Sequence, residues 1–198
     1  MKAGDSVVIA TTNAGKITEV RQILGSLPLV LLTADDVGGW PPIEETGSTY
    51  RDNALLKGRA VAELTGLAVL ADDSGIEIDA LGGAPGVYSA RFAGPDATDA
   101  DNNSLLIARL AGVPEQSRTA RYRCVAVVVE PGCGEVASEG TCEGRIGFEP
   151  RGSGGFGYDP WFIPAGETRT MAELSPEEKD VISHRGRAFR NLAKQLMD

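Results

Sequence analysis

Two adjacent aspartates follow an apolar run in the stretch LAVLADDSGIEI, residues 67–78. The apolar residues are typical of a buried strand, so we expect Asp72 and Asp73 at the carboxyl end of that strand. With Glu44 and Glu45 they could bind Mg²⁺, which proteins usually hold with one or two carboxylates, waters and phosphate oxygens. An acidic pair alone favours the alternative, in which the aspartates cap a turn and the glutamates are solvated. The strand-end position favours the metal site, because α/β proteins bind ligands there.

A phosphate-binding turn is indicated by TTNAGK, residues 11–16. Apolar residues typical of a strand precede this segment, and apolar residues at helical spacing follow it. The N–H groups of a helix N-terminus together with one lysine can hold a phosphate group. The segment is not a Walker A loop, because Ala10 stands at the required first glycine and Ile17 follows Lys16. Taken in isolation, it fits an asparagine-capped helix with an exposed lysine better.

A third candidate segment is GSGGFGYDP, residues 152–160. Its glycines let a backbone approach a planar ligand, and Phe156 or Tyr158 could stack on a base. A glycine-rich hairpin is the alternative. His184 is the one histidine of a chain whose net charge is −9. Its basic neighbours in the sequence are Lys179, Arg185 and Arg187. A surface histidine is the plainer interpretation, but an anionic ligand requires such a local reversal of charge.

The elements that position these segments alternate between strands and helices. We expect strands at residues 6–12 and 29–33, a strand from Leu67 that ends at Asp72 and Asp73, a strand at residues 121–130, and a strand at residues 135–139 that pairs with the one before it across a Pro-Gly turn. Helices are expected after residue 16, from Ser48 or Thr49 to Gly66, at residues 99–110, after Ser175, and at the end of the chain. This order predicts an α/β fold with a mixed central sheet flanked by helices.

Composition limits the classes of function. The chain has 198 residues, 42% of them hydrophobic, which suits one globular domain over residues 1–198. No apolar run approaches the roughly 20 residues of a membrane helix, so we expect a cytoplasmic protein without a membrane partner. The three cysteines have neither zinc-site nor disulfide-framework spacing and are interpreted as reduced thiols. The acidic net charge argues against a nucleic-acid partner.

Five ordered blocks of sequence resemble the Ham1/RdgB family, the inosine triphosphate pyrophosphatases. They are TTNAGK, EETGSTYRDNALLKGRA, ADDSGIEIDALGGAPGVYSARFAG, GGFGYDP and ELSPEEKDVISHRGRA, and together they span nearly the whole chain. The resemblance implies an elongated α/β domain with a ligand cleft between two lobes, and a homodimer, for which the ARFAG region and the final helix offer candidate surface. It implies that water attacks the α-phosphorus of a non-standard purine nucleoside triphosphate such as ITP, dITP or XTP. The products are then the monophosphate and pyrophosphate, with Mg²⁺ as cofactor.

The resemblance also implies roles for individual residues. Asp73 is the expected general base and a metal-site residue. Glu45 is favoured as the metal-binding glutamate because TGST follows it in the expected register, and Glu44 stays open as the alternative. Thr12 stands where many relatives have glycine. The expected substrate contacts are Thr11, Thr12, Asn13, Lys16, Ser74, Phe156, Gly157, Tyr158, Asp159, Lys179, His184 and Arg185.

Selectivity for a 6-keto purine requires a hydrogen-bond donor aimed at O6, and His184 or Arg185 could supply it. Two other functions stay open from the sequence. One is the same chemistry on another modified or standard nucleoside triphosphate. The other is a nucleotide-binding sensor without catalysis.

Overall fold

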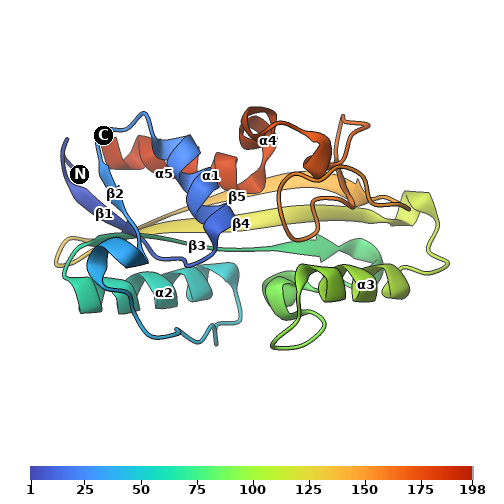
Figure 1. The fold of residues 1–198 in the computed structure, drawn as a ribbon, viewed down its shortest axis with the longest axis horizontal. Helices are drawn as coiled ribbons and strands as arrows, with labels where there is room; N and C mark the ends of the chain where they lie inside the picture. The colour runs from blue at the N-terminus through green and yellow to red at the C-terminus, as the bar shows by residue number, and fades with distance from the viewer. Residues whose placement is uncertain (198) are drawn as a thin grey trace. The chain divides into compact units, whose positions relative to one another are not determined.

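The computed structural model describes residues 1–197, with only the backbone described at residue 197. It contains a six-stranded sheet with the strand order β2-β1-β3-β4-β5-β6 (Figure 1). The strands are β1 (Ser6–Ile9), β2 (Val30–Leu32), β3 (Ala68–Ile78), β4 (Thr119–Glu130), β5 (Gly134–Ile146) and β6 (Phe162–Pro164). Strand β1 pairs in parallel with β2 and β3, whereas β5 and β6 pair antiparallel. The predicted mixed sheet of an α/β fold is confirmed.

The helices are α1 (Ala14–Leu24), α2 (Tyr50–Thr65), α3 (Asp99–Arg109), α4 (Pro176–Ile182) and α5 (His184–Met197). Short 3₁₀ helices occur at Ala34–Val37, Asp79–Leu81, Gly86–Arg91, Glu115–Ser117 and Met171–Glu173. None of the helices in the described part of the chain is both long and apolar enough to cross a membrane.

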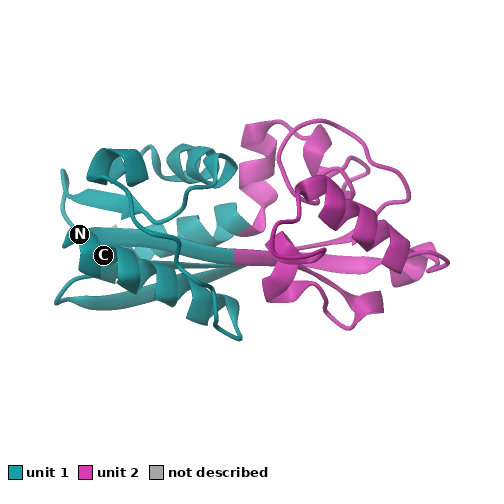
Figure 2. Cartoon of the chain, turned by 60° about the horizontal axis from the view of Figure 1, so that its bottom comes forward, with its two compact units in different colours: residues 1–73, 124–140, 185–198 teal, residues 74–123, 141–184 magenta. Residues whose placement is uncertain are grey.

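The chain divides into two compact units (Figure 2). Unit 1 comprises residues 1–73, 124–140 and 185–198, and unit 2 comprises residues 74–123 and 141–184. Each unit has a hydrophobic core of its own. The organisation of residues 1–198 as one domain, and the ligand cleft between two lobes, stay predictions.

In unit 1, helices α1 and α5 lie on one face of the strands and α2 lies on the other (Figure 1). The first face packs Leu70 and its neighbours in β1, β3 and β4 against Leu24 of α1 and Phe189 of α5. On the other face, α2 approaches closely at Gly58, where an added Cβ would lie 2.8 Å from Cγ2 of Val129. The unit is therefore two helical layers around a buried sheet.

The predicted limits of α2 and the predicted start of α4 are confirmed. Thr49 caps α2, since its side chain accepts a hydrogen bond from the N–H of Asp52, and Gly66 ends the helix with a φ of 68°. Ser175 caps α4 in the same way by accepting from the N–H of Glu178, and Pro176 follows it. These ends are set by local hydrogen bonds, which is why the sequence shows them.

Three predicted strand limits are wrong. Strand β3 continues to Ile78 instead of ending at the two aspartates, because Ile76 and Ile78 are fully buried and carry the buried face of the strand onward. Strand β5 extends to Ile146, well beyond the predicted end at Glu139. Strand β1 ends at Ile9, before the turn into α1, and not at residue 12 as expected.

Candidate active site

The two adjacent aspartates lie in the middle of β3 and point to opposite faces of the sheet. Side chains of successive strand residues alternate between the faces. Asp72 accepts a hydrogen bond from Lys16 of α1, at 3.0 Å, whereas Asp73 accepts one from Asn53 of α2, at 3.0 Å. The expectation that β3 ends at the aspartates and delivers both to one place is therefore wrong. The strand that ends here is β1, whose last residue paired with β3 lies opposite Leu70.

Asp72 is the centre of a buried ionic cluster. Its Oδ2 lies 3.0 Å from Nζ of Lys16 and 3.3 Å from Nη2 of Arg185. Arg185 also donates to Glu19, so its guanidinium lies between two carboxylates with 1% of the residue exposed. Burial alone would raise the pKa of Asp72, but the charges of Lys16, Arg185 and Lys57 hold that pKa well below its ordinary value. Asp72 is consequently an ionised structural partner of Lys16.

Asp73 belongs to a second cluster, on the α2 face. Nζ of Lys57 donates to Oε1 of Glu45 and lies 3.7 Å from Oδ1 of Asp73. Burial raises the pKa of Asp73 above its ordinary value, even though the ammonium of Lys57 opposes the shift. Burial would lower the pKa of Lys57, but Asp73, Asp72 and Glu45 raise it overall. Asp73 and Glu45 thus face one cation, whereas Glu44 is exposed to solvent.

Asn53 and Lys57 are site residues that sequence reasoning missed. The amide of Asn53 donates to Oδ2 of Asp73, and its Oδ1 accepts a hydrogen bond from the N–H of Gly47, at 2.8 Å. This fully buried side chain therefore ties the loop that carries Glu45 to the aspartate. The available signal was their spacing, since polar residues four apart share one face of a helix.

The segment TTNAGK forms the turn into α1. The carboxamide of Asn13 accepts a hydrogen bond from the N–H of Lys16, at 3.1 Å, and α1 begins at Ala14. The asparagine-capped helix considered from the sequence is present, but Lys16 is mostly buried against Asp72, with 16% of its side chain exposed. The N–H groups of the first turn of α1 and the side chain of Lys16 thus lie at one place.

A cavity of about 420 Å³ in unit 1 joins this turn to the loop of residues 40–45. The residues that line it come from the turn into α1, the loop of residues 40–45 and α2, and they are Ala10, Thr11, Thr12, Asn13, Lys16, Trp40, Pro41, Pro42, Ile43, Glu45 and Lys57. The structure therefore brings together four predicted substrate contacts and one predicted metal ligand. The Trp-Pro-Pro wall was not expected from the sequence.

The glycine-rich segment lies in unit 2 and is held by Asp159. This carboxylate accepts from Nζ of Lys179, at 2.6 Å, and from the N–H of Phe156, at 3.0 Å. The same ammonium lies 5.0 Å from the centre of the Phe156 ring. Gly157 is fixed by α3, because its N–H donates to Asp99. Three of the predicted base-side residues thus form one connected cluster.

Two further residues differ from the simplest expectations. Tyr158 is buried in the core of unit 2, where its hydroxyl donates to the carbonyl of Ser89 and burial raises its pKa. Phe156 is therefore the aromatic residue left to stack on a base. His184 is not a surface histidine, since it is only 5% exposed. Ser74, the first residue of unit 2, is partly exposed.

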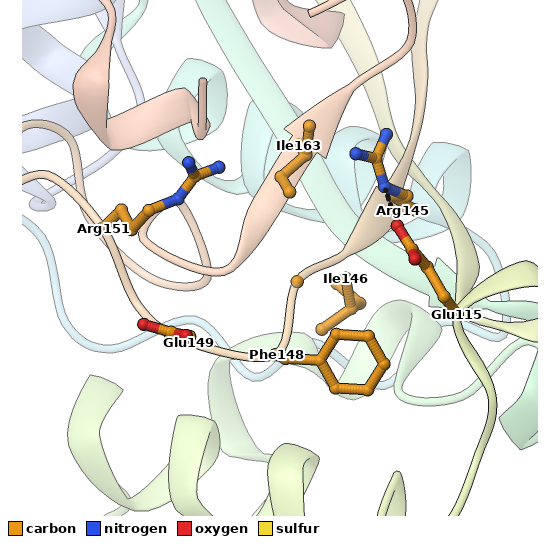
Figure 3. A pocket seen from close by; sticks show the side chains of 8 residues that line it. Glu115, Arg145, Ile146, Phe148, Glu149, Arg151 and Ile163 are labelled. Atoms are coloured by element: carbon orange, nitrogen blue, oxygen red, sulfur yellow. Dashed lines mark ion pairs between the residues drawn. The ribbon is translucent and has the colours of Figure 1, made fainter. Parts of the chain in front are cut away.

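A second cavity, of about 400 Å³, lies elsewhere in unit 2 (Figure 3). Phe148, which is 57% exposed, lines this cavity, and Nε of Arg145 in its wall lies 3.5 Å from Oε1 of Glu115. Arg151, also in its wall, is paired with Glu173 at 3.6 Å. None of the residues that line it is a predicted site residue, and its two arginines already have acidic partners within the unit.

Comparison with known proteins places this geometry in a family. A model described as the Ham1 family matches residues 7–195. A dITP/XTP pyrophosphatase of Exiguobacterium sibiricum is 49% identical over 190 residues, 96% of each chain, and one of Streptomyces coelicolor is 50% identical over 188 residues, 94% of each chain. A solved HAM1 protein from Coxiella burnetii matches with a TM-score of 0.87 and 42% identity over 98% of each chain. A nucleoside-triphosphatase, or dITP/XTP pyrophosphatase, of Mycobacterium abscessus matches with a TM-score of 0.76 and 44% identity, over 96% of this chain and 98% of that one. This chain belongs to the Ham1 family.

Proposed function

We propose that this protein hydrolyses non-standard purine nucleoside triphosphates, ITP, dITP and XTP, to the monophosphate and pyrophosphate. The observation that carries the proposal is the unit 1 cavity, whose wall combines a helix N-terminus, the cations Lys16 and Lys57, and the acid Glu45. Relatives about half identical over nearly the whole chain bear the name dITP/XTP pyrophosphatase. We further propose a cytoplasmic enzyme that cleanses the nucleotide pool, and a homodimer.

Mg²⁺ is the proposed cofactor, and Glu45 and Asp73 are its proposed ligands. Both carboxylates lie beside the ammonium of Lys57, so both face a position where positive charge is favoured. Among the described residues, no three acidic, histidine or cysteine side chains form a cage. That fits Mg²⁺, which completes its six ligands with water and phosphate oxygens. When bound, Mg²⁺ would neutralise phosphate charge and orient the substrate for in-line attack.

The protein's own groups supply phosphate binding and proton transfer. The N–H groups at the start of α1 and the ammonium of Lys16 bind the phosphates that leave as pyrophosphate. Asp73 accepts a proton from the attacking water, whose oxygen bonds to the α-phosphorus while the bond to the bridging oxygen breaks. The raised pKa of Asp73 makes its ionised form a better proton acceptor.

Recognition of the base is assigned to unit 2. Phe156 offers a ring for stacking, Lys179 and Asp159 hold its loop, and His184 is the proposed donor to O6. Arg185, the other donor considered, is bound by two carboxylates in unit 1, so we assign it to the phosphate side. A buried polar site that loses its partner discriminates by about 10⁴ or more, which suffices to separate a 6-keto purine from adenine.

The test is product analysis with the purified protein and MgCl₂, using dITP, ITP, XTP, GTP, ATP and dUTP in parallel. We expect one pyrophosphate per monophosphate, and a kcat/KM for dITP, ITP or XTP well above that for ATP. In ¹⁸O-labelled water the label should enter the monophosphate, because attack is at the α-phosphorus. Orthophosphate as the direct product, or label in pyrophosphate, would refute the proposal. Tight binding of ITP with turnover that Asp73→Asn leaves unchanged would favour a sensor.

A further inference from the structure

We infer that Tyr122 is the positioning residue for base selectivity, because its side chain contacts both His184 and Asp159. This inference rests on the proposed function, since it concerns how the same site recognises its base. Tyr122 lies in β4, is 7% exposed and packs against Phe162, with ring centres 4.7 Å apart. Nothing in its sequence surroundings marked it as a site residue.

The first contact fixes the plane of the imidazole. The rings of Tyr122 and His184 are stacked, with their centres 4.6 Å apart and their planes 8° from parallel. Tyr122 is itself wedged against Phe162, so its ring is a fixed surface. A parallel stack limits rotation of the imidazole about its side-chain bonds, and the ring nitrogens of His184 therefore have a set direction.

The second contact fixes the carboxylate that holds the glycine-rich segment. The hydroxyl of Tyr122 donates to Oδ1 of Asp159, at 3.1 Å. The other oxygen, Oδ2, accepts from Lys179 and from the backbone of Phe156. With both oxygens engaged, the carboxylate has one orientation, and the positions of the lysine and the phenylalanine depend on it.

One buried side chain thus joins the proposed O6 donor to the proposed stacking platform. The ring and the hydroxyl make separable contributions, because the ring contacts His184 and the hydroxyl contacts Asp159. Tyr122→Phe removes the hydroxyl and keeps the stack. Tyr122→Leu removes both. Tyr88→Leu is the matched control, since Tyr88 is 58% exposed and lies outside the proposed site.

The kinetic test compares dITP with dATP, which differ at position 6 of the base. Tyr122→Phe should lower kcat/KM for dITP by about 10-fold, the effect of losing one hydrogen bond to a charged acceptor. Tyr122→Leu should lower it by about 100-fold, because the stack is lost as well. The decrease should appear as a higher KM with kcat nearly unchanged, since Asp73 is untouched. The ratio of kcat/KM for dITP to that for dATP should fall in Tyr122→Leu, which no longer orients His184, and stay constant in Tyr122→Phe and Tyr88→Leu.

A second readout is independent of catalysis. His184 is the only histidine in the chain, so its ring protons give unambiguous NMR signals. Protons above an aromatic ring face are shifted upfield. We expect the imidazole signals of the wild type, Tyr122→Phe and Tyr88→Leu to share that shift, and those of Tyr122→Leu to lose it.

Unchanged imidazole signals in Tyr122→Leu would overturn the inference, and so would a selectivity ratio within twofold of the wild type in Tyr122→Leu. If Tyr122→Leu does not fold, Tyr122→Phe decides alone, and a kcat/KM for dITP within twofold of the wild type would overturn the inference. A wild type that releases no pyrophosphate from dITP would instead refute the proposed function. In that case the NMR comparison would still show whether Tyr122 orients His184.

Discussion

The neighbours Asp72 and Asp73 should respond in opposite ways to the same substitution, aspartate to asparagine. The two side chains have nearly the same shape before and after the change, so only charge and hydrogen bonding differ. They lie on opposite faces of β3, one beside Lys16 and the other beside Asn53. We expect Asp72→Asn to lose stability and Asp73→Asn to lose turnover.

The magnitude for Asp72→Asn follows from its cluster. Removing one partner of a buried ion pair costs about 3–5 kcal/mol, because the other charge is left uncompensated. Arg185 keeps Glu19, and the asparagine oxygen can still accept a hydrogen bond, so the lower end applies. We expect a loss of about 3 kcal/mol, a large part of the roughly 5–15 kcal/mol that stabilises an ordinary domain.

Asp73→Asn should change the free energy of unfolding by less than about 1 kcal/mol. The asparagine oxygen can accept the hydrogen bond from Asn53, and Lys57 keeps Glu45 as its partner. Burial already disfavours the ionised carboxylate, so replacing it with a neutral amide removes a cost. Turnover should be abolished, because the amide cannot accept the proton of the attacking water.

The effect of Asp72 should also depend on pH. Its pKa in the folded protein is below the ordinary 3.8, so its stabilisation is present above pH 3.8 and is lost as pH falls further. The stability difference between wild type and Asp72→Asn should therefore shrink below that pH.

Urea unfolding followed by tryptophan fluorescence measures stability, and pyrophosphate release from dITP measures turnover. A wild-type-like urea midpoint for Asp72→Asn together with a loss of more than 2 kcal/mol for Asp73→Asn would refute the assignment of the two faces. Near-normal turnover of Asp73→Asn would refute its role as the base.

Three further substitutions test other parts of the site. Glu45→Gln should raise the Mg²⁺ concentration needed for half-maximal turnover at least several-fold. Glu44→Gln should leave that concentration unchanged, because only Glu45 faces the buried cluster. Equal effects of the two substitutions in a Mg²⁺ titration would contradict this. Gly155→Ala should raise KM for dITP, because the added Cβ would lie 2.0 Å from Oδ2 of Asp159 and the backbone φ of 70° disfavours a side chain. An unchanged KM would show that the glycine-rich segment can move aside. Ser175→Ala should cost about 1 kcal/mol in urea unfolding through loss of the helix cap, and an unchanged midpoint would show that the cap contributes nothing.

The sequence by itself carried the features that depend on near neighbours. Caps at Thr49 and Ser175 are made within three residues of the helix they begin, so local sequence predicted them correctly. The ordered motifs of the sequence identified the family. The end of β3 was missed for the opposite reason, because Asp72 and Asp73 remain in a strand that continues through Ile76 and Ile78, which pack against residues distant in the sequence.

Only the tertiary structure decided which residues meet. Successive side chains of a strand point to opposite faces, so the adjacent aspartates are separated. Helices distant in the sequence then supply their partners, Lys16 for Asp72 and Asn53 for Asp73. The contact of Tyr122 with His184 joins residues more than sixty positions apart, and no pattern along the chain encodes it. Residue types and spacing thus determined the chemistry this protein can perform. Long-range packing decided which side chains perform it, because burial and partner charge, which set ionisation and orientation, arise only when the chain has folded.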